Sequence, residues 1–151
     1  MYTLVRRFIK TGILFLFAGL ILGAWMLVRR ELSGVWPHPY LVSAHAHAVL
    51  VGFVMFMILG VALWLFPRAA KDDSRYSPRR AESVYWLLLV STAGRFVAEA
   101  ARAWSDSPLL GWVVVLGGFG QIAALGLYFF MMWNRIRPLG SQVREARGER
   151  F

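Results

Sequence analysis

The sequence contains no cysteine, and this absence excludes several kinds of site. Disulfides, thiolate-bound metals, iron–sulfur clusters and covalently attached c-type haem all need cysteine. Any cofactor must therefore be held by histidine, methionine, oxygen ligands or packing alone. Charged residues are also few: 17% of the 151 residues are charged and 58% are hydrophobic. A chain of this size and composition is too apolar for an ordinary soluble domain.

The sequence also lacks a continuous basic stripe interleaved with exposed aromatic residues, which nucleic-acid binding requires. The net charge is +9, but most basic residues are clustered between long apolar runs. This distribution is typical of the segments that flank membrane spans. It predicts the lipid bilayer, and no nucleic acid, as a partner.

Four apolar segments are each long enough to cross a hydrocarbon core, which needs about 20 helical residues. The first follows a basic cluster, as in a signal peptide, but it is long and has no clear cleavage site, so we expect it to be retained. The runs lack the alternation of a membrane β-barrel. The sequence predicts a single all-α membrane domain over 1–151, an up-and-down bundle of four transmembrane helices. These helices are expected at 11–29, 40–66, 82–104 and 108–133.

The basic residues also predict the orientation of the bundle. Thirteen Lys and Arg residues lie before the first helix, in the 67–81 loop or in the tail 135–151, against three in the other two loops. The positive-inside rule then places both termini in the cytoplasm. The Arg-rich cytoplasmic tail is expected to rest on anionic lipid. Gly19 and Gly23, four residues apart, mark either a close helix contact or a lipid-facing surface.

All three histidines, His38, His45 and His47, fall within ten residues at or near the start of the second helix. A histidine inside a membrane span is a functional candidate, because a buried polar ring without a partner is costly. Residues two apart point about 200° apart on a regular helix, so His45 and His47 cannot both hold one metal centre there. Gly52 and Gly60 share the stripe of His45, and we expect them to leave space for a flat macrocycle.

The segment Ser43-Ala44-His45-Ala46-His47-Ala48-Val49-Leu50-Val51-Gly52, running on to Leu65-Phe66-Pro67-Arg68, resembles the second helix of subunit I of the haem–copper oxidases and nitric oxide reductases. Short stand-alone relatives of that subunit and the NnrS family have a similar His-Ala-His start. The resemblance covers one fifth of the chain. It implies a non-covalent haem b near the outer membrane face, with His45 as an axial ligand and His47 as the rival ligand. It also implies the cell (inner) membrane of a bacterium or archaeon.

The copper site, the second haem and the opposite axial ligand of those oxidases have no matching residues here. We therefore expect electron transfer, or binding of nitric oxide or oxygen, and no oxygen-reducing enzyme. The opposite ligand has three possible sources: His45 of a second copy in a homodimer, a methionine such as Met55 or Met57, or a gas at an open position.

Arg95, Glu99 and Arg102 follow spacings of four and three and so share one face of the third helix. In a haem protein, the two arginines would hold the propionates and Glu99 would orient a histidine ring. The alternative is an intramembrane ion pair with Arg102 extending to the interface. Gln121 on the fourth helix is expected to form an interhelical hydrogen bond.

Two further functions stay open. One is a copper- or zinc-binding membrane module that uses the His-x-His pair, with His38 or a neighbouring protomer completing the site. In the other, the histidines bind no metal, and the chain is a cofactor-free assembly or interaction subunit of a respiratory complex.

Overall fold

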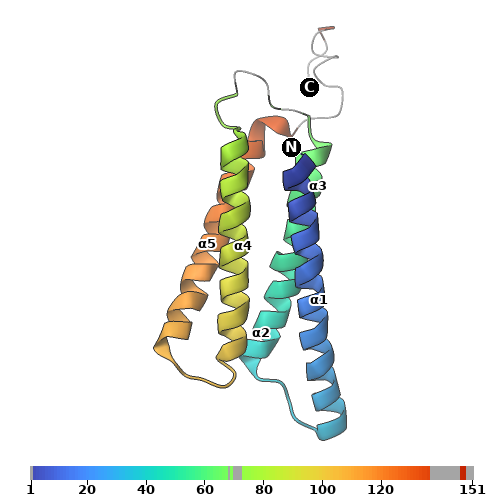
Figure 1. Ribbon diagram of the computed structural model, residues 1–151, viewed down its shortest axis with the longest axis vertical. Coiled ribbons are helices and arrows are strands. Elements are labelled where there is room, and N and C mark those ends of the chain that lie inside the picture. Colours follow the sequence, from blue (N-terminus) through green and yellow to red (C-terminus); the bar gives the residue numbers. More distant parts are fainter. Residues whose placement is uncertain (1, 68, 70–72, 137–146, 149–151) are drawn as a thin grey trace.

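The computed structural model describes residues 2–67, 69, 73–136 and 147–148. Within these residues the chain is helical and contains no strand, and four of its helical segments are long and apolar enough to cross a membrane (Figure 1). The predicted all-α bundle of four membrane-spanning helices is confirmed. Most of the predicted tail and part of the 67–81 loop lie outside the described residues. The helical elements are α1 (Tyr2–Ser33), α2 (Pro39–His47), η1 (Ala48–Met55), α3 (Phe56–Leu65), α4 (Pro78–Ala101), α5 (Pro108–Met132) and η2 (Trp133–Arg135).

Helix α1 extends well beyond the predicted 11–29 at both ends. Its basic first turns continue the helix outside the apolar run, where Arg7 forms an ion pair with Glu82 of α4 at 2.8 Å. Its far end is fixed by Gly34, whose φ of 65° is in the left-handed region that glycine adopts without strain. The amide of Gly34 donates to the carbonyl of Arg30, which is the bond of an αL C-cap, and the amide of Val35 donates to the carbonyl of Arg29.

The second span is not one regular helix. It begins as α2, widens into the π-helix η1 and continues as α3, so its limits, Pro39–Leu65, agree with the predicted 40–66. A π-helical segment changes the rotation of the residues that follow it, and such segments are frequent at functional sites. His45 and His47 lie directly before this segment.

The other two spans begin at prolines. Ser77 caps α4 by accepting a hydrogen bond from the Arg80 amide at 3.1 Å, and Pro78 occupies the first turn. This start is earlier than the predicted residue 82, because the capped first turn lies outside the apolar run. Pro108 opens α5, as predicted.

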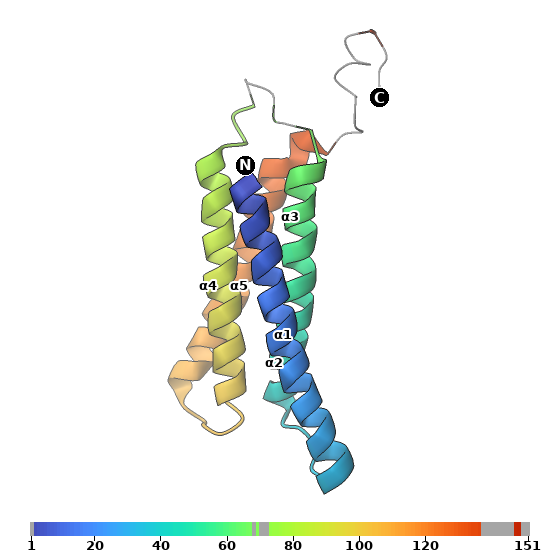
Figure 2. The ribbon, with the colours of Figure 1, turned by 45° about the vertical axis from the view of Figure 1, so that its right-hand side comes forward.

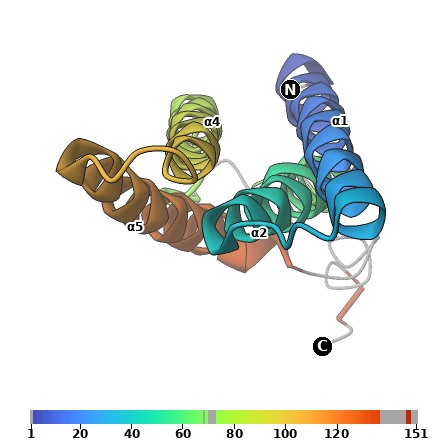
Figure 3. The same ribbon diagram turned by 90° about the horizontal axis from the view of Figure 1, so that it is seen from below.

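The second span lies at the centre of the bundle. Helix α1 packs on η1 and α3, α2 packs on α4, and α4 packs along α5. Figure 3 shows α2 between α1 and α4, and Figure 2 shows the end of α1 extending beyond the other helices. Two faces of the second span are therefore covered by different helices.

We name the two ends of the bundle by the predicted orientation. The inner end is where α1 and α4 begin and α3 and α5 finish, and the outer end is opposite (Figure 1). The main apolar core occupies the inner half and middle, around Phe8, Phe56 and Leu59. Tyr128 donates to the Leu59 carbonyl at 2.7 Å, and buried Arg135 donates to the Pro67 carbonyl at 2.7 Å. These bonds attach α5 to the second span.

Candidate functional site: two histidines on opposite faces

The His45 ring faces α1. Its Nδ1 lies 2.8 Å from the carbonyl oxygen of Gly19, one helix away. Because a carbonyl oxygen only accepts, Nδ1 carries the proton and donates. In the neutral ring the lone pair is then on Nε2, which is the nitrogen left free for a metal. A ligand histidine is usually oriented by a hydrogen bond of this kind from its other nitrogen.

Gly23 provides the space in which the His45 ring lies. A Cβ atom at position 23 would stand 3.0 Å from His45 Nδ1 and 2.7 Å from Cε1, and the second distance is shorter than real Cβ contacts. At Gly19, a Cβ would stand 2.8 Å from a methyl group of Val49. Of the two alternatives for this glycine pair, the structure therefore shows the close helix contact. The same contact both positions the histidine and orients it.

His45 also lines an open pocket of about 260 Å³ between α1 and the start of the second span. Arg30 stands at this pocket, and its guanidinium is also bonded to the carboxylate of neighbouring Glu31 at 2.6 Å. A cation beside an imidazole and apolar walls suits an amphipathic ligand with an anionic edge. The remaining lining residues are Gly23, Met26, Leu27, Pro37 and Val42.

The space predicted beside Gly52 is not open. A Cβ at Gly52 would stand 2.5 Å from Phe15, and one at Gly60 would stand 2.8 Å from Phe8. Both glycines instead allow close approach of phenylalanine side chains of α1. The prediction that they leave room for a macrocycle is wrong, because the pattern within one helix does not reveal which side chains a neighbouring helix inserts.

His47 faces α4, on the opposite side of α2. Its Nδ1 donates to the carbonyl of Ser43 in its own helix at 2.9 Å and lies 3.2 Å from Glu99 Oε2. The Ser43 hydroxyl donates to Glu99 Oε1 at 3.0 Å. As predicted, His45 and His47 diverge and do not face a common centre. Glu99 stands beside a histidine as expected, but that histidine is His47.

Glu99 belongs to a buried polar network that joins α2, α4 and α5. Arg95 Nε donates to Glu99 Oε1 at 2.9 Å, and Arg95 Nη1 donates to Gln121 Oε1 at 3.2 Å. Gln121 in turn donates to the Thr92 hydroxyl at 3.2 Å, so its predicted interhelical role is confirmed. Glu99 is only 1% exposed. This arrangement matches the intramembrane ion pair, and it directs Arg95 and Glu99 away from the face of His45.

Arg102 ends α4 and takes no part in that ion pair. Its guanidinium carbon lies 4.4 Å from the centre of the Tyr40 ring, a cation–π contact with the start of α2. In the described part of the chain, Arg102 Nε and Glu99 Oε2 are buried without a hydrogen-bond partner. Glu99 Oε2 lies 3.2 Å from His47 Nδ1, but the N–H of that nitrogen points at the Ser43 carbonyl and forms no hydrogen bond with the carboxylate.

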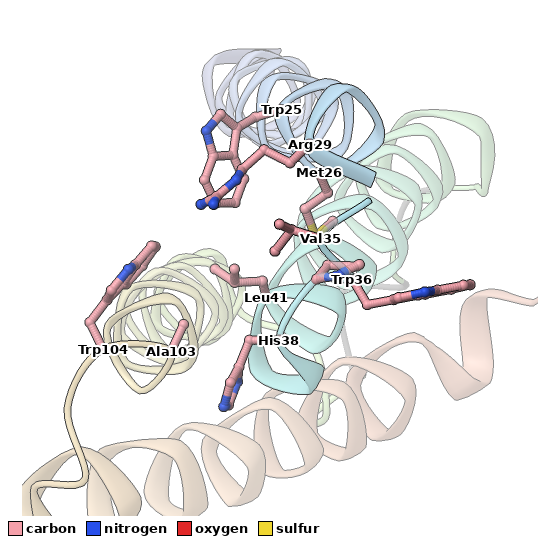
Figure 4. Close-up of a pocket in the computed structure, with 10 residues that line it drawn as sticks. Trp25, Met26, Arg29, Val35, Trp36, His38, Leu41, Ala103 and Trp104 are labelled. Carbon is pink, nitrogen blue, oxygen red and sulfur yellow. The ribbon is translucent and has the colours of Figure 1, made fainter. Parts of the chain in front are cut away.

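His38 has a structural position at the outer end. Its Nδ1 accepts a hydrogen bond from the Tyr40 amide at 3.3 Å, which caps α2. It borders a second pocket, of about 130 Å³, in which Trp25 and Trp104 face each other while the His38 ring points away (Figure 4). The residues that the structure describes include no group of three or more His, Cys, Asp or Glu side chains able to hold a metal ion.

Some residues of these sites were not predicted to belong to them. Only the structure places the Gly19 carbonyl and Arg30 beside His45. It likewise places Ser43 beside Glu99, and Thr92 beside Gln121. The sequence spacing could have indicated two of them, since Ser43 is one turn before His47 and Thr92 is three residues before Arg95. No sequence pattern could have indicated the Gly19 carbonyl, because its contact with His45 depends on how two helices pack.

The fold and the buried polar groups define a multi-pass membrane protein of four spans. The chain matches no protein-family model, no curated protein and no solved structure. The resemblance to oxidase subunit I and the NnrS family thus stays a prediction.

Proposed function

We propose that this chain is a b-type haem-binding protein of a bacterial or archaeal cell membrane, with His45 as an axial ligand. Its role would be electron transfer or the binding of nitric oxide or oxygen. The observation that carries the proposal is the orientation of His45. Its Nδ1 donates to Gly19 and its ring lies against Gly23, which leaves Nε2 as the ligating nitrogen at the edge of a pocket.

The residues around His45 suit an iron porphyrin. A neutral imidazole is an ordinary axial ligand, and the walls formed by Met26, Leu27 and Val42 suit an apolar macrocycle. Arg30 would bind a propionate, a role that we now assign to it in place of Arg95 and Arg102. When bound, haem supplies a one-electron redox centre and, where one axial position is open, a binding site for a diatomic gas.

Size favours two copies around one haem. The pocket of about 260 Å³ is smaller than the roughly 300–1,000 Å³ typical of small-molecule sites. It is also open on one side, so a single chain would cover only part of a porphyrin. A homodimer would place a second His45 on the other side of the ring.

The test is single replacement of each histidine. The chain is produced in haem-replete cells and extracted in mild detergent, and haem per chain is measured from the Soret absorbance. We expect His45→Ala to lose nearly all haem and His47→Ala to retain it. Size-exclusion chromatography with light scattering then gives the number of copies per haem.

His47→Ala is the matched control, since it removes an imidazole only two residues away. If His47→Ala loses haem and His45→Ala retains it, then His47 is the ligand and Glu99 is the group that orients it. A wild-type protein that is folded but colourless would refute haem binding. A pale protein that holds copper through both histidines would favour the His-x-His alternative.

A further inference from the structure

A groove runs between α4 and α5 at the inner end of the bundle, far along the chain from the histidines. Its volume is about 470 Å³, compared with about 260 Å³ for the pocket beside His45. Leu127 and Phe130 are both more than half exposed, so this side of the bundle faces lipid. The walls are apolar, formed by Val84, Leu127, Phe130 and Met131.

Two arginines stand at the groove, and the chain holds both in place. The Arg75 guanidinium lies 5.4 Å from the centre of the Phe130 ring, and its Nη1 donates to the Asn134 side chain at 3.3 Å. Arg80 uses Nη1 to donate to the carbonyls of Ser74 and Arg75, at 2.6 and 2.9 Å. The turn before α4 therefore holds both arginines beside the apolar walls of the groove.

Among the residues that the structure describes, no carboxylate forms an ion pair with either of these arginines. Asp73 accepts hydrogen bonds from the Arg75 amide at 3.0 Å and from Asn134 at 3.4 Å. Its carboxylate forms no ion pair with the guanidinium of Arg75 or of Arg80, all three being residues that the structure describes. Two guanidinium groups thus stand above a hydrophobic groove at the inner end of the spans, the end that the predicted orientation would place beside lipid phosphates.

From this arrangement we infer that the groove is a binding site for one anionic glycerophospholipid of the inner leaflet. The phosphate would accept hydrogen bonds from Arg75 and Arg80, and an acyl chain would lie along Leu127 and Met131. A zwitterionic lipid is the poorer ligand, because its ammonium group would stand beside two guanidinium groups. The site is independent of haem, since it lies on α4 and α5 while His45 faces α1.

The experiment uses the full-length protein, stripped of lipid and placed in nanodiscs that contain phosphatidylglycerol and phosphatidylcholine in equal amounts. Native mass spectrometry counts the lipids that stay bound to each chain. Three variants are compared: Arg75→Gln with Arg80→Gln, Leu127→Trp, and Arg79→Gln. Leu127→Trp fills the groove and leaves every charge in place, and Arg79→Gln removes a neighbouring charge that does not line the groove.

We expect the wild type to retain one phosphatidylglycerol in preference to phosphatidylcholine. The preference should fall about fivefold for each groove arginine removed, and also in Leu127→Trp, but not in Arg79→Gln. Equal retention of the two lipids would overturn the inference. So would an unchanged preference in Leu127→Trp, or an equal loss in Arg79→Gln, since either result would mean general attraction to a basic surface. Should the double variant fail to fold, Leu127→Trp against Arg79→Gln decides the question.

Discussion

His45 and His47 are two residues apart on one helix, yet they occupy opposite environments. Each donates from Nδ1 to a backbone carbonyl, but His45 reaches Gly19 on α1 whereas His47 reaches Ser43 within α2. His45 lies against a glycine and a pocket, whereas His47 lies beside a buried carboxylate. Helical rotation separates the two rings, and two different neighbouring helices then give them different chemistry.

The two environments suit different roles, the proposed ligation by His45 and a structural contact by His47. The orientation of His45 depends on a contact between helices, and its second nitrogen is left for a partner. His47 is joined through Ser43 and Glu99 to a network that extends to Gln121 on α5. Buried, linked polar groups of this kind hold helices together, and losing one leaves its partners uncompensated.

The largest effect on stability is expected from Glu99→Ala, which removes the carboxylate beside His47. Arg95 would lose its carboxylate partner inside the bundle, and the free energy of unfolding should fall by about 3 kcal/mol. Thermal or denaturant unfolding of the purified protein measures this loss. The double variant Arg95→Leu with Glu99→Ala should recover part of it, since no charge is then left unpaired. If the Glu99→Ala protein folds but binds no haem, the cofactor would lie on the face of His47 and not on that of His45.

Gly23→Ala fills the space in which the His45 ring lies and should have an intermediate effect on stability. The new methyl group would meet His45 Cε1 at 2.7 Å, displace the ring and cost about 1–3 kcal/mol through overpacking. Haem per folded chain should drop together with stability. Gly126→Ala is the matched control, because a Cβ there meets nothing within 4 Å. If Gly23→Ala keeps its full Soret absorbance, the ring does not need this glycine and our account of its orientation is wrong.

Ser43→Ala should have the smallest effect and sharpens the comparison. It removes the hydroxyl that donates to Glu99 but keeps the backbone carbonyl that holds His47. Interhelical hydrogen bonds in membranes average about 0.6 kcal/mol, so a loss near that size is expected on unfolding. In the Glu99→Ala background the same change should cost nothing more. A cost that persists there would show that the hydroxyl acts through another group.

Much of the bundle could be predicted because its signals are local. Four spans are predicted by apolar runs of sufficient length, by Pro108 at a helix start and by the placement of basic residues. The structure has these four spans. Helix ends were less predictable, since the polar first turns of α1 and α4 and the glycine-terminated end of α1 lie outside the apolar runs. The spacing of Arg95 and Glu99 likewise gave their ion pair without any knowledge of the neighbouring helices.

The site divides in the same way. The sequence by itself determined that His45 and His47 lie in a span and diverge, because 3.6 residues per turn sets their angle. Only the tertiary structure decided that Phe15 fills the space at Gly52 and that Gly23, on another helix, admits the His45 ring. It also decided which histidine meets Glu99. The physical reason is that rotation along one helix is a local property, whereas the partner of each face depends on how separate helices pack.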